Sequence, residues 1–214
     1  MNIKKLLVTI LLAAATLSAV AHADTVYSNS DDGTSTISYV GEPDTTSYGQ
    51  YFTAPGGVLK GFSFQALSGA SGDLALVVAA WDGSKAVGPA LYTSAPINYG
   101  GGSQFLGAGD INLALTAGTD YIAYLTVAGI ASPVSYVTMV GSDTATGIGG
   151  GFRYLNSNLV DPLTLNFDWN AFSTQHLAYT ATFAAAVPEV ETYAMLLAGL
   201  GTMGVVARRR QRRA

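Results

Sequence analysis

The residue types that carry most enzyme chemistry are scarce in this chain. It contains no cysteine and two histidines, His22 and His176. Without cysteine there is no thiol nucleophile, and one histidine beyond the N-terminal segment leaves too few ligands for a zinc site. His176 alternates with Gln175 and Leu177 as in a strand, and no Gly-x-Ser-x-Gly motif accompanies it. The pattern favours a structural histidine over a general base.

Carboxylates are the other candidates for acid–base chemistry. Between residues 24 and 186, Glu42 is the only glutamate, and most aspartates stand beside Gly, Ser, Thr or Asn. Aspartate in such positions hydrogen-bonds its own backbone in turns, so a catalytic carboxylate pair is not indicated. We therefore predict that the protein is not an enzyme and needs no cofactor.

Two acidic segments could contribute oxygen ligands to a structural calcium ion. They are Asp31-Asp32-Gly33 and Asp161 to Asp168. Calcium takes several oxygens from loops, but neither segment resembles the twelve-residue calcium loop that ends in a bidentate glutamate. The sequence assigns no metal ligand, and a structural calcium stays open.

An aromatic face beside amide and carboxylate groups could bind a sugar. Trp169, in the segment Asn166-Phe167-Asp168-Trp169-Asn170, is the first candidate, together with Asp168. Weaker candidates are Tyr48, Tyr51, Tyr99 and Tyr154. For each ring, packing inside the domain is favoured over contact with a ligand, and Trp81, which ends an apolar run, is predicted to belong to the core.

The elements that must position these residues are predicted to be strands. Phe62 to Ala66 alternates apolar and polar residues, as a half-buried strand does. Asp73 to Trp81 is a short apolar run, typical of a strand covered on both faces. Asp110 to Leu115 and Asp120 to Val127 flank a turn sequence and predict a hairpin. Further predicted strands are 34–40, 48–53, 134–140, 151–156 and 175–183.

Residues 24–186 therefore form one predicted domain. Turn residues separate the strands throughout, and no segment of this body has helical periodicity. Roughly ten short strands predict an all-β fold, an antiparallel β-sandwich of jelly-roll type. The layout of the strands is similar to jelly-roll domains of other exported bacterial proteins, some with folds like carbohydrate-binding modules.

The charge of the body excludes one class of partner. It has three cations and twelve anions, a net charge of −9, whereas the whole chain has −4. A surface of that sign repels phosphate backbones, so nucleic-acid binding is not expected. The absence of cysteine also means that no disulfide stabilises the core.

The N-terminal 23 residues have the order of a secretory signal peptide. Lys4 and Lys5 precede the apolar run Leu6 to Val20, and Ala21-His22-Ala23 has small residues at the cleavage-defining positions. We predict an apolar signal helix that the export translocon and signal peptidase recognise, with cleavage after Ala23. An uncut N-terminal anchor is the alternative.

The C-terminal residues 187–214 have the order of a membrane-sorting tail. The apolar stretch Thr192 to Ala207 is 16 residues long and apolar on all sides. It is followed by Arg208, Arg209, Arg210, Arg212 and Arg213. Arginines favour the cytoplasmic headgroup region and resist export, so we predict a transmembrane helix with its C-terminus inside. A buried core helix is the alternative.

The sequence VPEVETYAMLLAGLGTMGVVARRR resembles the PEP-CTERM protein-sorting tail, which is also catalogued as the C-terminal motif of some ice-binding proteins. Pro188 and Glu189 match the family signature after Val187, while Val190 stands where the commonest form has a second proline. The resemblance implies that a membrane-embedded exosortase recognises this motif, cuts near it and discards the helix and arginines. The resemblance also implies that the protein comes from a bacterium that makes exopolysaccharide. It covers only the tail and the export signal.

Together these patterns predict an exported, non-enzymatic β-sandwich protein. Its body is expected in the periplasm while the tail lies in the inner membrane, and at the cell surface or outside after processing. Two hypotheses for the body remain: a structural matrix component associated with exopolysaccharide, which has no discrete aromatic pocket, and a carbohydrate-binding module, in which Trp169 is exposed. Ice binding is a third, although the threonines follow no fixed repeat.

Overall fold

The computed structural model describes residues 23–30, 35–144, 148–171, 175–184 and 199–200. Residues 23–185 form one compact unit, which contains every strand described. The predicted signal peptide up to His22, the sorting motif, the arginine cluster and the acidic segment 31–33 lie outside the described residues. Among the described residues, no helix has the length and apolar character needed to cross a membrane.

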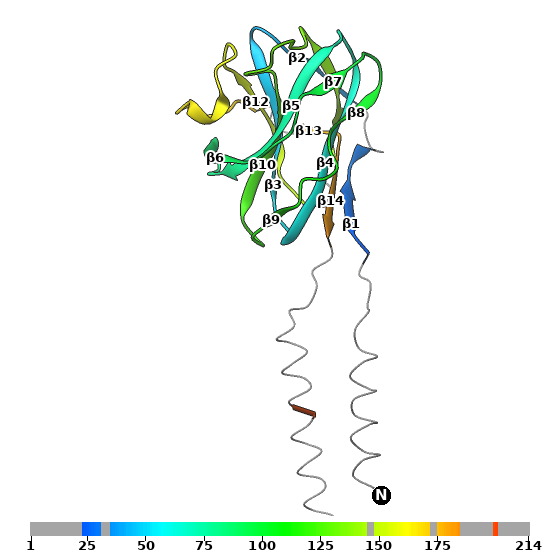
Figure 1. Ribbon diagram of the computed structural model, residues 1–214, viewed down its shortest axis with the longest axis vertical. Helices are drawn as coiled ribbons and strands as arrows, with labels where there is room; N and C mark the ends of the chain where they lie inside the picture. Colours follow the sequence, from blue (N-terminus) through cyan, green and yellow to red (C-terminus); the bar gives the residue numbers. More distant parts are fainter. Residues whose placement is uncertain (1–22, 31–34, 145–147, 172–174, 185–198, 201–214) are drawn as a thin grey trace, which may run out of the picture. The chain divides into compact units, whose positions relative to one another are not determined.

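Two antiparallel sheets face one another as layers, which confirms the predicted all-β class and the β-sandwich (Figure 1). The first sheet contains β1 (Thr25–Ser28), β2 (Ser35–Val40), β4 (Gly57–Gly69), β8 (Gln104–Ala108), β9 (Leu113–Leu115), β11 (Val137–Ser142), β13 (His176–Leu177) and β14 (Tyr179–Ala184). The second contains β3 (Thr45–Thr53), β5 (Gly72–Trp81), β6 (Ala86–Thr93), β7 (Ile97–Tyr99), β10 (Asp120–Thr126) and β12 (Gly151–Asn156).

Strand β4 organises the first sheet because other strands pair with both of its edges. Along one edge it pairs with β14 and then β11, and along the other with β9 and then β8. β1 extends the sheet beyond β14, and β2 extends it beyond β11. The second sheet has the order β12-β3-β10-β5-β6, and β7 also pairs with β5.

Aromatic side chains fill the space between the two sheets. The ring centroid of Phe52 on β3 lies 5.5 Å from that of Phe62 on β4, and Phe62 stacks on Tyr179 of β14 at 5.4 Å. All three side chains are at most 1% exposed. Burial of such apolar area is the main favourable term in folding, and here no disulfide supplements it.

A second apolar cluster covers part of the outer face of the second sheet. Trp81, Tyr124 and Trp169 belong to it, and Leu163 and Leu165 pack against it. Leu163 lies in the short 3-10 helix η2 (Pro162–Thr164), and Leu165 follows directly. The loop around η2 thus closes over the sheet, and β5 is buried on both faces, as its apolar run predicts.

The hairpin predicted from Asp110 to Val127 is wrong. The turn itself forms, because the Thr119 N–H donates to the Thr116 carbonyl at 3.3 Å. However, β9 pairs with β4 in the first sheet, whereas β10 pairs with β3 and β5 in the second. The turn therefore carries the chain from one sheet to the other. Alternation of apolar residues predicts a strand, but it does not identify the strand's partner.

The close approach of β8 to β4 requires glycine at position 107. A Cβ there would lie 2.1 Å from the Phe62 carbonyl oxygen and 2.5 Å from the Ser63 Cα. We expect Gly107→Ala to lower the free energy of unfolding by about 1–3 kcal/mol, because the backbone of β4 or β8 must shift. Gly109→Ala is the matched control, since a Cβ at Gly109 meets no atom within 4 Å. Equal stability of the two variants in urea denaturation would contradict this packing.

Candidate functional site

Trp169 does not offer the exposed face that the carbohydrate-binding hypothesis requires, and it packs inside the domain instead. Its side chain is only 6% exposed, with its ring centroid 5.2 Å from that of Tyr124 and 6.1 Å from that of Trp81. Polar neighbours in the sequence indicate a loop, which is confirmed, but the loop folds back and buries its tryptophan against the sheet. Asp168 is exposed and accepts a hydrogen bond from the Ser84 hydroxyl at 2.7 Å, so it fastens the loop to the β5–β6 turn.

The other predicted aromatic candidates lie in different environments. Tyr99 is fully buried, and Trp81 is in the apolar cluster, as predicted. Tyr51 stacks on Trp81 at 5.8 Å, and the Arg153 guanidinium lies 4.6 Å above the Tyr51 ring. Tyr48 and Tyr154 line one pocket together, so the aromatic candidates from the sequence lie in several different places in the fold.

The carboxylates of the acidic segment 161–168 form hydrogen bonds that hold the loop, and they do not converge on one metal site. The Asp161 carboxylate accepts the Leu163 N–H at 3.0 Å and caps η2. Asp168 bonds to Ser84 at a different position. Across the ranges that the structure describes, no group of three His, Asp or Glu side chains could hold a metal ion.

A hydrogen bond between two neutral side chains, His176 and Gln50, joins the two sheets. Gln50 on β3 accepts the Leu177 N–H at 3.2 Å through its Oε1, so its Nε2 donates to His176 Nδ1 at 3.0 Å. An accepting Nδ1 carries no proton. Burial lowers the pKa of His176, while the charge of Asp143 acts in the opposite direction. The histidine is 8% exposed and has the structural role that its strand context predicts.

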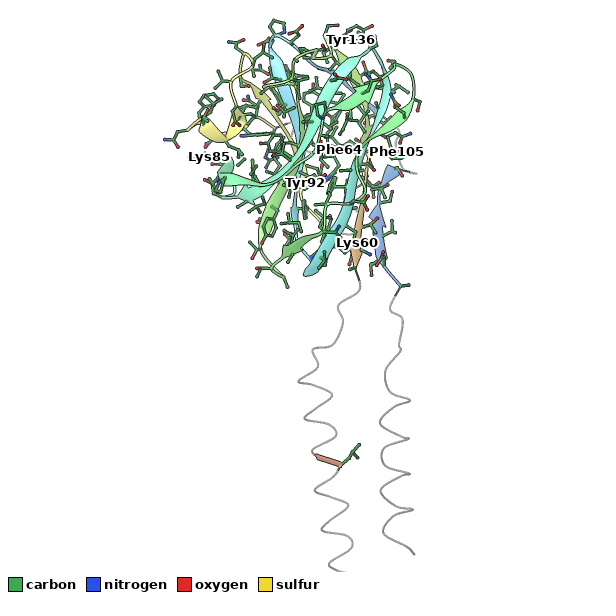
Figure 2. The ribbon with its side chains drawn as sticks, in the orientation of Figure 1. Lys60, Phe64, Lys85, Tyr92, Phe105 and Tyr136 are labelled. Atoms are coloured by element: carbon green, nitrogen blue, oxygen red, sulfur yellow. The ribbon has the colours of Figure 1, made fainter. Side chains whose placement is uncertain are left out.

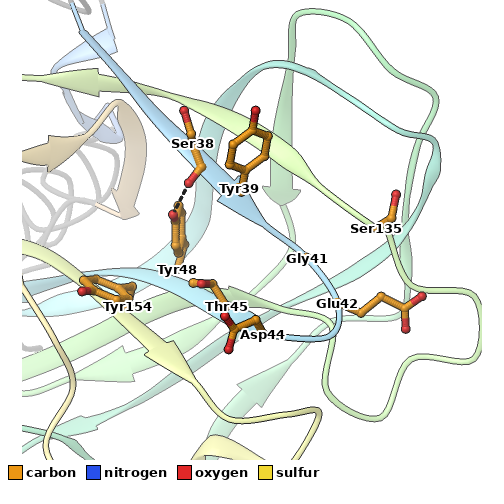
Figure 3. A pocket seen from close by; sticks show the side chains of 9 residues that line it. All are labelled: Ser38, Tyr39, Gly41, Glu42, Asp44, Thr45, Tyr48, Ser135 and Tyr154. Atoms are coloured by element: carbon orange, nitrogen blue, oxygen red, sulfur yellow. Dashed lines mark hydrogen bonds between the residues drawn. The ribbon is translucent and has the colours of Figure 1, made fainter.

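A pocket with a polar and aromatic lining lies where β2 passes into β3 (Figure 3). Its volume is about 380 Å³. The lining residues are Ser38, Tyr39, Gly41, Glu42, Asp44, Thr45, Tyr48, Ser135 and Tyr154. We call this the turn pocket.

The turn that forms the pocket carries the chain between the two sheets. The Gly41 N–H donates to the Thr45 carbonyl at 2.9 Å, and the Glu42 N–H donates to the Val134 carbonyl at 3.1 Å. A side chain at position 41 is excluded because its Cβ would lie 2.4 Å from the Ser135 carbonyl oxygen. Backbone contacts thus fix the turn, and its side chains are left to face outward.

Tyr39 is the most unusual residue at the mouth of this pocket. Its φ of 66° lies in the left-handed region, which is rare for a bulky side chain, and its side chain is 63% exposed. Its ring meets the edge of Tyr136, itself 42% exposed, at 5.7 Å. Such strain is typically retained where the resulting side-chain position has a use. At Tyr39, a strained backbone conformation therefore coincides with an exposed aromatic side chain.

The floor and rim of the turn pocket are polar. The Tyr48 hydroxyl donates to the Ser38 carbonyl at 2.5 Å, and burial, together with nearby Tyr154, raises the pKa of Tyr48 to about 12. Tyr48 therefore stays a neutral phenol. Glu42 and Asp44 are exposed, and neither forms an ion pair with any described residue. The pocket combines aromatic faces with free carboxylate acceptors.

Sequence reasoning missed Tyr39, Tyr136 and the two carboxylates. The only signal was local: Tyr39-Val40-Gly41-Glu42-Pro43-Asp44 places a tyrosine directly before a turn with two acids. That segment does not indicate that Ser135 and Tyr136 come beside it, because this proximity results from the pairing of β2 with β11.

A second hollow, of about 300 Å³, lies on the outer face of the first sheet beside Phe105. Hydroxyl groups of Ser63, Thr180 and Thr182 line it, and it has no charged residue. Its glycine floor is explained by the close packing of β8 on β4. The hollow has one aromatic face and no carboxylate, so the turn pocket is the better candidate.

Comparison with known proteins gives no family assignment. No family model matches the chain, and no curated protein matches it. Among solved structures, it is similar to the cysteine protease and lectin-like domains of Cwp84, a surface-layer-associated protein of Clostridium difficile. The match has a TM-score of 0.49 and 10% identity, and covers 76% of this chain but only 36% of the other. A likeness at this level indicates nothing about function.

The neutral state of His176 predicts a pH dependence of stability. Because its pKa is lowered in the folded state, the unfolded chain binds the proton more readily. The contribution of the neutral histidine is complete above the ordinary pKa of 6.5 and is lost as the pH falls through the lowered pKa. We expect the free energy of unfolding of residues 23–185 to fall more steeply from pH 7 to pH 5 than that of His176→Gln. Parallel pH profiles of the two proteins would contradict the assignment.

Proposed function

We propose that this chain is an exported, non-enzymatic surface protein whose β-sandwich binds saccharides at the turn pocket. The observation that carries the proposal is Tyr39, an exposed ring in a strained backbone conformation. It lines the same pocket as Glu42 and Asp44, which form no ion pair with any described residue. Sugar rings present apolar C–H faces and many hydroxyls, so they suit an aromatic face with acceptors at its rim. The pocket volume of about 380 Å³ is within the range of small-ligand sites.

The charge around the turn pocket favours a neutral saccharide. Glu42 and Asp44 carry no compensating cation among the described residues, and the body as a whole has a charge of −9. An acidic polysaccharide would be repelled at this site. A purely structural matrix role is less well supported, because that hypothesis has no use for a discrete pocket with an exposed ring.

The route to the surface is proposed from the two ends of the sequence. Residues 1–23 act as a signal peptide, and residues 187–214 act as a PEP-CTERM-type sorting tail with an apolar transmembrane helix. The motif Val187-Pro188-Glu189-Val190 is the recognition site for an exosortase, and the arginine cluster is the cytoplasmic stop. The body, a module of jelly-roll type, is then held in the periplasm before release to an exopolysaccharide-rich surface.

The saccharide site is tested by removing the Tyr39 ring. Asparagine tolerates the left-handed backbone region, so Tyr39→Asn removes the aromatic face with little added strain. On an array of neutral and acidic polysaccharides, residues 23–185 should bind neutral chains, and Tyr39→Asn should raise the Kd about tenfold, equivalent to about 1.4 kcal/mol.

Phe105→Ala is the matched control, because Phe105 is also exposed (50%) but lines the other hollow. It should leave the affinity unchanged. If Phe105→Ala weakens binding and Tyr39→Asn does not, the turn pocket is not the site; if no polysaccharide binds, the proposed function fails.

The sorting route is tested by the C-terminus of the mature protein. In cells that carry the processing enzyme, mass spectrometry should find a species that ends near the motif and lacks the arginines. Replacing Pro188 and Glu189 by alanine should leave the uncut chain in the membrane fraction. A mature wild-type species that still ends at Ala214 would refute exosortase processing.

A further inference from the structure

The chain enters and leaves the sandwich at one end. β1 pairs with β14 so that Thr25, near the start of the unit, stands opposite Phe183, near its finish. Ala184 in turn stands opposite Val58, next to the first residue of β4. The Lys60 ammonium forms an ion pair with Asp24 at 3.5 Å in the same region. We call this end the terminal pole.

The turn pocket lies at the other end of β4. The last residue of that strand, Gly69, pairs with Val137, and Val137 pairs with Val40, which directly precedes the turn. The strand between the two ends has thirteen residues, which corresponds to about 40 Å at ~3.3 Å per residue. Figure 2 shows the same separation, with Lys60 near the lower end of the sandwich and Tyr136 near the upper end.

The turn pocket and the points where the described chain enters and leaves the sandwich therefore lie at opposite ends of β4. Any segment that continues from Ala184 leaves the sandwich at the terminal pole, and so does any segment that precedes Thr25. A pocket at the terminal pole would be covered by an attachment at either of these positions. The turn pocket lies at the opposite end of β4 and is left uncovered.

From this separation we propose that the turn pocket binds polymeric neutral polysaccharide both while the chain is held by its tail and after its release. The proposal rests on the proposed function and extends it to a large, surface-bound ligand. Processing of the tail is then not needed for binding. A long polymer reaches the pocket in the tethered protein as easily as in the released one.

Directed immobilisation tests the proposal, because the chain has no cysteine and a single new thiol defines the point of attachment. Ala117→Cys places it in an exposed turn at the terminal pole, where Gly118 N–H donates to Ala54 and Ala117 lies beside Gly56. Ser103→Cys places it in an exposed loop at the pocket pole, since neighbouring Gly101 lies beside Gly69. Neither residue lines the turn pocket.

Residues 23–185 with each substitution are coupled densely to maleimide beads. The probes are neutral exopolysaccharide from the cells that make this protein, as intact chains and as oligosaccharides released by partial acid hydrolysis. Protein attached through Ala117→Cys should bind the intact chains as well as free protein does. Protein attached through Ser103→Cys should lose binding of the intact chains and keep that of the oligosaccharides.

Equal binding of the intact chains in both orientations would overturn this proposal while leaving the saccharide site in place. Free protein that binds neither probe would instead refute the proposed function, and this proposal with it. Circular dichroism of both variants, matched to the parent, ensures that a loss of binding reflects orientation.

Discussion

The packing of β4 against the opposite sheet is the interaction on which the rest of this structure depends. Without disulfides, the sandwich relies on buried apolar area, and the contact of Phe62 with Phe52 and Tyr179 lies at its centre. β4 also pairs with four strands and so joins the parts of the first sheet. Its length separates Thr25 and Ala184, where the chain enters and leaves the sandwich, from the turn pocket.

The turn pocket results from the arrangement of the two sheets. β2 belongs to the first sheet and β3 to the second, so the residues between them must cross from one layer to the other. The crossing holds its backbone by hydrogen bonds to Val134 and Thr45, and it leaves Tyr39 in a left-handed conformation that a free chain would avoid. The packed core therefore holds an exposed ring in a backbone conformation that is rare for a bulky side chain.

Much of the fold follows from the sequence, and less of the site does. Two strands were predicted correctly, from the alternation in Phe62 to Ala66 and from the apolar run of Asp73 to Trp81. The order of apolar and polar residues depends directly on whether one face or both faces of a strand are buried. The partner of β9 and the burial of Trp169 depend on contacts between distant segments, which local patterns do not encode. Tyr39 was missed for the same reason, since Ser135 and Tyr136 reach it only through the β2–β11 pairing.

Backbone amide NMR tests the proposed saccharide binding at the turn pocket most directly. Uniformly labelled residues 23–185 would be titrated with neutral oligosaccharides from the cells' own exopolysaccharide. Chemical shift changes are expected at Tyr39, Gly41, Glu42, Thr45 and Ser135, with the amides around Phe105 unchanged. Shifts centred on Ser63, Phe105 and Thr180, or no shifts at saturating sugar, would contradict it.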